Sequence, residues 1–231
     1  WQPEGAPPQV DISTQQMVFD TAEGEHWPGG ALHLSWQGDD FNAGTFRADQ
    51  LDLEALAQVS QRLPVAANWR AVIARIKPKG QLEKFQAQWQ KPAPGAAPRV
   101  SARGSLRELR VLRDTVPGSP LANVPGIQGA QLDFDLTPDG GKAQLRIHQG
   151  SLTLPLGLDD PQLMLDQATA QLAWQHKDDQ WSVQVTQAQL ANADLMGQLD
   201  GSWKTGEGAK RWPGVLDLTA NIQRAQLAQV H

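Results

Sequence analysis

The sequence predicts a mainly β protein, built as a long, strongly curved antiparallel meander with a short helical insertion. Apolar and polar residues alternate over most of the chain, in runs bounded by Gly, Pro, Asn and Asp, which is the pattern of half-buried strands joined by turns. Helical spacing replaces this alternation between residues 51 and 80, and no crossover helix of about 15 residues separates the strands that follow. We expect strands over 1–50, a helical insertion over 51–80 and antiparallel strands over 81–231, all within one fragment of a longer protein.

The first 50 residues contain three expected strands, and two short helices follow. The strands are QVDISTQQMVFD, GALHLSWQG and FNAGTFRADQLDL, separated by Trp27-Pro28-Gly29-Gly30 and by Gly38-Asp39-Asp40. Apolar residues then recur at helical spacing as far as Pro78 and Gly80, and Pro64 breaks this pattern in two.

Strands return after the insertion and dominate the rest of the chain. The segment KPAPGAAP is an expected loop, and VPGSPLANVPGIQG is a second irregular stretch. It leads into the hairpin QLDFDLTPDGGKAQLRI, in which Leu132, Phe134 and Leu136 lie on one face. Leu145 and Ile147 return on the same side if the hairpin pairs in register.

The parity of the apolar residues shifts by one at three places in the tail. The shifts fall at Asp166-Gln167, Thr186-Gln187 and Ala191-Asn192, where an extra residue can form a β-bulge and keep the apolar residues on one side. Repeated bulges predict a strongly curved sheet with an apolar concave face. That face is buried either in a closed sandwich or barrel, or in a groove that meets another apolar body, and the alternation by itself favours the sandwich.

The charge of the chain is unevenly distributed. The 231 residues carry a net charge of −5, but residues 62–113 hold twelve Lys or Arg and two acids, so this part carries +10 and the remainder −15. A basic segment of this kind is either a solvated face or a surface for an anionic partner. The absence of cysteine excludes disulfides and thiolate chemistry, and no apolar run reaches the ~20 residues that span a bilayer.

No pattern of residues indicates catalysis, a metal site or a cofactor. The acidic pairs Asp39-Asp40, Asp159-Asp160 and Asp178-Asp179 lie at turn signals, where solvated carboxylates are ordinary. The five histidines lack the spacing of zinc ligands, and the sequence contains neither a phosphate loop nor a nucleophile elbow. From the lack of these motifs we predict a protein that is not an enzyme and needs no cofactor. The overall acidity argues against nucleic acid as a partner.

The tail contains, in order, VPGIQGAQLDFDLTPDGGKAQLRIHQGSLTLPLGL, then LMLDQATAQLAWQHKDDQWSVQVTQAQLANADLMGQLDGSW, then LDLTANIQRAQLAQVH. An earlier part contains LDLEALAQVSQRLP and IARIKPKGQLEKFQAQW. This order of elements resembles the central region of YhdP-type members of the AsmA-like bacterial envelope proteins. The resemblance covers nearly the whole chain and rests on strands and turns, because the family has no catalytic residues to match.

The resemblance implies a mainly β fold of the repeating β-groove type, in which the meander rolls into an apolar groove. It implies a bridge-like lipid-transfer protein of the periplasm, anchored in the inner membrane, that conducts phospholipid between inner and outer membranes and maintains the outer-membrane barrier. Other envelope proteins are candidate partners. An acyl chain gains about 0.8 kcal/mol for each CH₂ buried against apolar side chains.

The apolar residues of the predicted groove are the expected contacts of the phospholipid acyl chains. They are Leu132, Phe134, Leu136, Leu145, Ile147, Leu152, Leu154, Leu163, Leu165, Leu172, Trp174, Val183, Val185 and Leu195. Contacts with anionic lipid are expected at Arg70, Arg75, Lys77 and Lys79, in the basic segment.

Two other classes of function stay open. The alternative is a closed β-sandwich that serves as a structural or protein-interaction module of the cell envelope, and it should carry no lipid when purified. An envelope glycan hydrolase would need two carboxylates about 5 to 10 Å apart in a cleft, and the sequence singles out no such pair.

Overall fold

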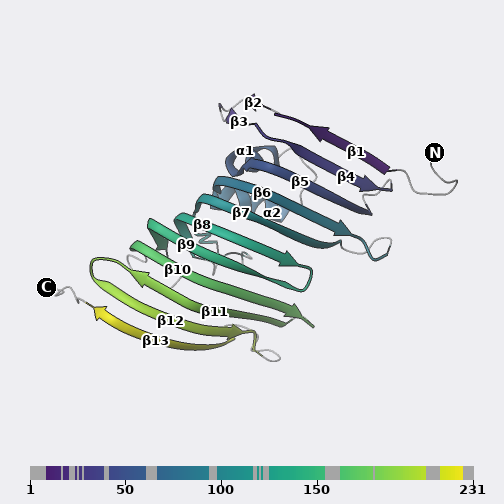
Figure 1. Cartoon of the computed structure of the whole chain (residues 1–231). Coiled ribbons are helices and arrows are strands. Elements are labelled where there is room, and N and C mark those ends of the chain that lie inside the picture. The colour runs from purple at the N-terminus through teal and green to yellow at the C-terminus, as the bar shows by residue number, and fades with distance from the viewer. Residues whose placement is uncertain are drawn as a thin grey trace.

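The computed structural model describes residues 9–16, 18–20, 24, 26–27, 29–38, 42–60, 67–93, 98–116, 119, 121, 125–153, 162–178, 180–206 and 214–225. These residues form an eleven-stranded antiparallel sheet, a two-stranded ribbon and two helices (Figure 1). The sheet contains β1 (Gln9–Thr14), β4 (Leu32–Gln37), β5 (Ala43–Asp52), β6 (Lys79–Gln90), β7 (Arg99–Val111), β8 (Gly126–Thr137), β9 (Gly140–Thr153), β10 (Gln162–Lys177), β11 (Gln180–Ala191), β12 (Leu195–Lys204) and β13 (Val215–Ala225). The ribbon pairs β2 (Phe19–Asp20) with β3 (His26–Trp27), and the helices are α1 (Leu53–Ser60) and α2 (Ala67–Ile76).

Strand order in the large sheet follows the order of the chain. Each strand pairs with the sheet strands before and after it in sequence, so the sheet is a meander with β1 and β13 as its two edges. Figure 1 places these edges at opposite ends of a curved sheet, which does not close into a barrel. The predicted curved antiparallel meander with a short helical insertion is therefore confirmed. Of the two arrangements that the sequence left open, the sheet has the open one, because the described residues do not form a closed sandwich.

Both helices lie on one face of the sheet, behind it in the view of Figure 1. Helix α1 begins directly after β5, where the Asp52 carboxylate accepts a hydrogen bond of 2.8 Å from the backbone N–H of Ala55. Ala55 is fully buried in a cluster with Leu82 of β6. Helix α2 ends at Ile76, whose carbonyl accepts a hydrogen bond of 2.7 Å from the N–H of Leu112, just after β7. The insertion therefore packs on the sheet, while the predicted break at Pro64 lies outside the described residues.

The parity shift at Thr186-Gln187 is a β-bulge, as predicted. The register between β11 and β12 shifts between Val185 and Ala188, and Gln187 has a φ of 52°. The extra residue of the bulge, in its left-handed conformation, places Ala188 on the same side of the sheet as Val185.

The other two predicted bulges are wrong. The register between β9 and β10 is unbroken across Asp166, because β9 changes parity at the same level, at Gln149 with a φ of 51°. Strand β11 ends at Ala191, and Asn192 begins a hairpin turn in which its side-chain oxygen accepts a hydrogen bond of 2.7 Å from the N–H of Leu195.

Left-handed residues recur on five of the six strands from β6 to β11, all but β10, and form a seam of bulges through the middle of the sheet. They are Lys84 of β6, Glu108 of β7, Gly129 of β8, Gln149 of β9 and Gln187 of β11, with φ values of 52°, 51°, 74°, 51° and 52°. Each lies within or beside a register shift against a neighbouring strand. The bulge seam bends the strands and keeps the apolar residues on one face despite the change in parity.

Candidate functional site

One face of the sheet carries an unbroken row of apolar or glycine residues that crosses every strand. Register pairs link these residues one to the next from edge to edge, so the row follows the hydrogen-bonding direction. With neighbouring strands about 4.8 Å apart, the row extends over roughly 50 Å. Its members are Ile12, Leu34, Phe46, Ala87, Ala102, Leu136, Gly141, Trp174, Val183, Trp203 and Leu216. We call the side of the sheet that bears this row the apolar face.

The opposite face is polar along the neighbouring row. Ten of its eleven members are polar or charged, and the exception is Ala173. They are Ser13, His33, Arg47, Gln86, Arg103, Asp135, Lys142, Ala173, Gln184, Ser202 and Asp217. Side chains on the apolar face cover one another, since Ala143 there is 8% exposed whereas Ala173 on the polar face is exposed. The sheet therefore separates an apolar side from a water-facing side.

The predicted lipid contacts gather on the apolar face. Register pairs bring Leu132 opposite Leu145 and Leu152 opposite Leu163, and Val185 follows Val183 at a spacing of two. Ile147 and Leu165 are buried within a cluster, and the other described members are half-buried: Leu132, Phe134, Leu136, Leu145, Leu152, Leu163, Leu172, Trp174, Val183, Val185 and Leu195. Leu154 lies outside the described residues. The half-buried residues therefore provide the accessible surface of the apolar face.

The sequence-based set missed the apolar face of both edge strands. Val10 and Ile12 of β1 are 38% and 48% exposed, and Leu216 and Ile222 of β13 are 63% and 61% exposed. Their alternation, in QVDIS and VLDLTANI, has the same period of two as the central strands, so the signal was available. The apolar face therefore continues to both edges of the sheet.

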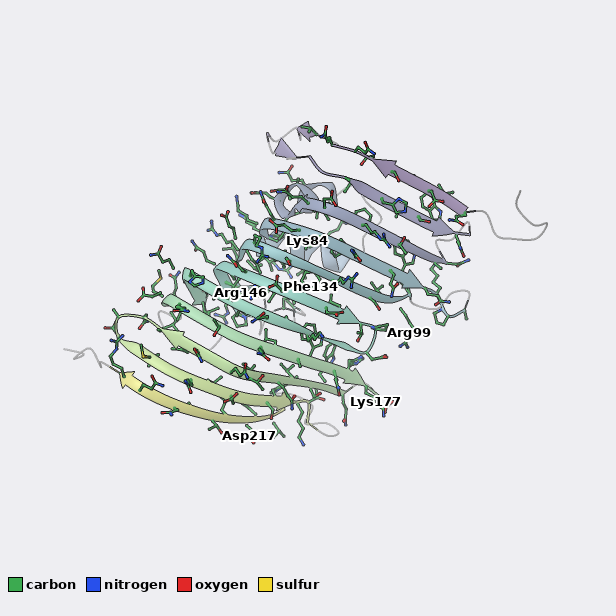
Figure 2. All side chains as sticks on the ribbon, viewed as in Figure 1. Lys84, Arg99, Phe134, Arg146, Lys177 and Asp217 are labelled. Atoms are coloured by element: carbon green, nitrogen blue, oxygen red, sulfur yellow. The ribbon has the colours of Figure 1, made fainter. Side chains whose placement is uncertain are left out.

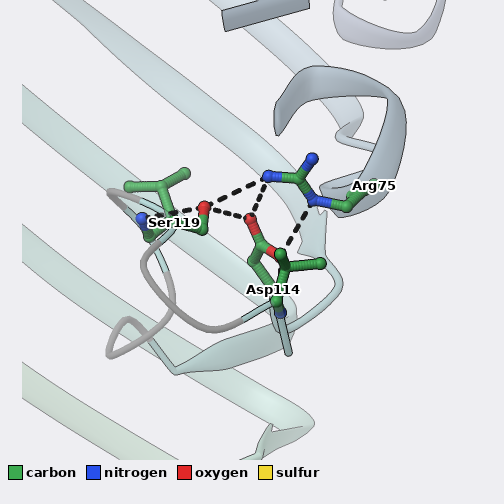
Figure 3. A network of polar contacts seen from close by, with 5 residues as sticks. Arg75, Asp114 and Ser119 are labelled. Atoms are coloured by element: carbon green, nitrogen blue, oxygen red, sulfur yellow. Dashed lines mark hydrogen bonds and ion pairs between the residues drawn. The ribbon is translucent and has the colours of Figure 1, made fainter. Parts of the chain in front are cut away.

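The four predicted basic contacts have different surroundings. The Arg75 guanidinium donates to Asp114 from Nε at 3.0 Å and from Nη2 at 2.9 Å, and Ser119 adds its hydroxyl to the same network (Figure 3). Lys79 forms an ion pair with Glu54 of α1. Lys77 is exposed and Arg70 is half-buried. Two of the four charges are thus neutralised within the protein.

Asp114 is the most deeply buried charged group of the described residues, with 2% of its surface exposed. The hydrogen bonds from Arg75 and Ser119 hold the pKa of its carboxyl well below the usual range, against the opposing effect of burial. Because Asp114 follows β7 and Arg75 belongs to α2, this pair fastens the helical insertion to the sheet.

A ladder of charges crosses the polar face over four strands. Arg107 of β7 lies between Glu83 of β6 and Asp133 of β8, with nitrogen to oxygen distances of 3.3 and 3.6 Å, and Arg146 of β9 pairs with the same Asp133. The hydrogen bond from Ser105, and after it the one from Arg146, lower the pKa of Asp133. The basic excess of this part of the chain is thus partly balanced on the polar face.

The described residues contain neither a candidate metal centre nor a membrane-crossing helix. No three His, Asp or Glu side chains gather at ligand distance in this part of the protein. None of its helices is both long and apolar enough to cross a bilayer.

A single open sheet with one apolar face, continuous over eleven strands, places the protein among those built around a β-groove. The sequence model described as YhdP protein matches residues 1–231, so the chain belongs to the YhdP family. At the level of the family, this membership supports a bridge-like lipid-transfer protein of the cell envelope. No curated protein and no solved structure matches the chain.

Proposed function

We propose that the chain conducts phospholipid along its apolar face, as part of a bridge between the inner and outer membranes that maintains the outer-membrane barrier. The observation that carries this proposal is the apolar row from Ile12 to Leu216, in which no strand contributes a polar side chain. An acyl chain lying along the row meets a similar surface at each step of about 4.8 Å. Each buried CH₂ contributes about 0.8 kcal/mol wherever it lies, so the chain can slide without a deep minimum.

The proposal includes no chemical step. The acyl chains occupy the apolar face and their headgroups stay in water, as the separation of the two faces suggests. In the full-length protein, the periplasm is the compartment, an inner-membrane anchor fixes one end, and envelope proteins are the candidate partners. Family membership supports this placement.

The open sheet favours this function over the protein-interaction module. A closed sandwich would bury its apolar residues against itself, whereas here Leu172, Val183 and Val185 stay half-buried with no second sheet over them in the described part of the chain. Large exposed apolar surfaces on a protein mark a binding site for an apolar partner.

The test places a carboxylate on each face of one strand. Val183→Asp puts a charge into the apolar row, while Gln184→Asp puts the same charge on the polar face one residue away. We expect purified Val183→Asp to retain at least roughly tenfold less phospholipid by mass spectrometry of the extract, because a charge in an apolar lipid environment costs about 2.5 kcal/mol or more.

The control should retain lipid at the level of the unaltered protein. Circular dichroism and thermal melting of both variants establish that the sheet persists. Equal lipid retention by two folded variants would reject the proposal.

A further inference from the structure

The apolar face has two unlike long edges, because its tryptophans all lie at the same ends of the strands. Trp36 and Trp89 are the penultimate residues of β4 and β6, Trp203 is penultimate in β12, and Trp174 lies three residues before the end of β10. These four strands run in the same direction, and Trp181 stands near the start of the antiparallel β11. Every described tryptophan of the large sheet therefore belongs to one edge, which we call the tryptophan edge.

The opposite ends of β7 to β10 carry aliphatic residues on this face. One register row there links Val111, Ile127, Leu152 and Leu163 across β7 to β10. Beside it, Ile147 and Leu165 are buried, with 0% and 2% exposed. This side, which we call the aliphatic edge, thus includes the most deeply buried residues of the apolar face.

The packing of the tryptophans fixes their rings along the edge. An added Cβ on Gly141 would lie 2.6 Å from Cζ2 of Trp174, so the indole lies across the glycine of the neighbouring strand. Trp89 lies across Gly44 in the same way. Glycine at both positions makes room for the ring of the neighbouring strand, and both rings are half-buried.

Cations lie at the same strand ends as the tryptophans, on the polar side of the strands. Lys177 and Lys204 are the last residues of β10 and β12 and share the parity of Ala173 and Ser202 on the polar face. Both are exposed, and neither has an ion-pair partner among the described residues. Figure 2 shows Lys177 and Arg99, the latter paired with Asp139, at this side of the sheet, and Lys84 and Arg146, near the middle of β6 and β9, farther from it. A hollow of about 880 Å³ at this edge is lined by Lys142, Trp174, His176 and Lys177, and by Asp135, Asp139 and Asp178.

Some cations near the aliphatic edge are held by the protein, whereas Lys77 and Arg110 are exposed there. Arg75 is bound to Asp114, Lys79 to Glu54, and Arg224 donates to the carbonyl of Asn192. Tryptophan with neighbouring Lys or Arg is the combination that occupies the boundary between hydrocarbon and water, because indole has an apolar body and a polar N–H.

We propose that the tryptophan edge is the headgroup side of the lipid path, so that phospholipids lie across the sheet with their acyl ends toward the aliphatic edge and their phosphates beyond the strand ends, where the side chains of Lys177 and Lys204 leave from the polar side. This inference rests on the proposed function and adds an orientation to it. The tryptophans mark the glycerol level, the lysines meet the phosphate, and Leu152 and Leu163 meet the chain ends.

Two photoreactive phosphatidylcholine analogues test the orientation, one with a diazirine in the headgroup and one with a diazirine at the acyl terminus. After loading and irradiation, the headgroup analogue should label peptides around Trp174 to Trp181 and Trp203. The acyl-terminal analogue should label peptides containing Leu152 and Leu163. Labelling in the reverse order, or equal labelling of both edges by both analogues, would overturn the orientation while leaving lipid binding intact.

A failure of the proposed function would look different, because neither analogue would then label the protein. A charge-reversed variant adds a second readout. Lys177→Glu with Lys204→Glu should lower headgroup labelling of this edge by about fivefold for each charge removed, since one Lys near a phosphate surface contributes about that factor. Lys84→Glu, at the bulge seam, is the matched control and should label as the unaltered protein does. Unchanged headgroup labelling in the double variant would overturn the assignment of the phosphate to these lysines.

Discussion

Arg75 of α2 and Asp114, just after β7, form a two-point ion pair that joins elements 39 residues apart in sequence, with nitrogen to oxygen distances of 3.0 and 2.9 Å. Asp114→Asn should weaken this attachment, because the amide loses the charge and one acceptor while Arg75 keeps its charge. We expect a melting temperature lower by several degrees and faster amide hydrogen exchange in α2, measured by mass spectrometry.

The exposed pair of Arg99 and Asp139 is the control for that loss. Its side chains are 55% and 70% exposed, so Arg99→Gln should cost less than about 1 kcal/mol. If Asp114→Asn and Arg99→Gln melted alike, Asp114 would not be what fastens the insertion.

Stability should fall in acid because two carboxylates have lowered pKa values in the folded protein. The pKa of Asp114 is lowered by Arg75, and that of Asp133 by Ser105 and then Arg146. A group with a lowered folded pKa stabilises the protein above its unfolded pKa, about 3.9, and loses this contribution as the pH falls below that value. We expect a flat melting temperature from pH 7 to about pH 5 and a steep decrease below about pH 4.

Calorimetry across this range separates the contribution of one carboxylate. The decrease should be smaller in Asp114→Asn, because one of the two titrating groups is gone. An identical acid profile for the variant and the unaltered protein would assign the pH dependence to other groups.

Lys84 in the bulge seam should prefer glycine to any β-branched residue, since its φ of 52° is costly for a side chain. Lys84→Gly should raise the free energy of unfolding by about 1 kcal/mol, and Lys84→Val should lower it by a similar amount. Urea denaturation measures both changes. The order should reverse at Gln88 of the same strand, where Val suits an extended backbone and Gly does not. The same order at both positions would contradict a special backbone at Lys84.

Gly141→Ala should destabilise the sheet, because the new Cβ would lie 2.6 Å from Cζ2 of Trp174 and 2.9 Å from the carbonyl oxygen of Asp135. Overpacking of this kind costs about 1 to 3 kcal/mol, measurable in urea. Trp174→Leu in the same background should recover only part of the loss, since the carbonyl contact remains. Gly197→Ala is a milder control, with its nearest contact at 3.2 Å, and an equal cost there would argue against the ring as the cause.

The alternation of residues was sufficient to predict most of the strands and the apolar face of the central ones. Leu132, Phe134 and Leu136 share a face with Leu145 and Ile147 because a period of two fixes orientation once the hairpin register is set. Parity does not distinguish a bulge from a turn, however, so Ala191-Asn192 was mistaken for a bulge although Asn192 and Asp194 are turn-forming residues.

Other features of the site depend on packing between distant segments. Alternation predicts that Ile147 and Val183 both lie on the apolar face, but it does not predict how deeply each is buried. Ile147 is buried because it lies within a compact cluster, whereas Val183 is half-buried. The pairing of Arg75 with Asp114 has no local signature, so Arg75 was expected to meet anionic lipid. The position of the tryptophans along one edge emerges only when strand direction and strand length are both known.

The uninterrupted row across the strands also determines which changes in chain length the sheet can absorb. Removing one residue from the middle of β10, at Ala173 for example, would rotate every following side chain of that strand by half a turn and send Trp174 into water. Removing two would shorten the strand and leave the remaining side chains where they were. Strands of such a protein can therefore be shortened or extended by two residues at a time without turning their side chains to the other face. A single-residue insertion or deletion needs a compensating bulge to restore the apolar face.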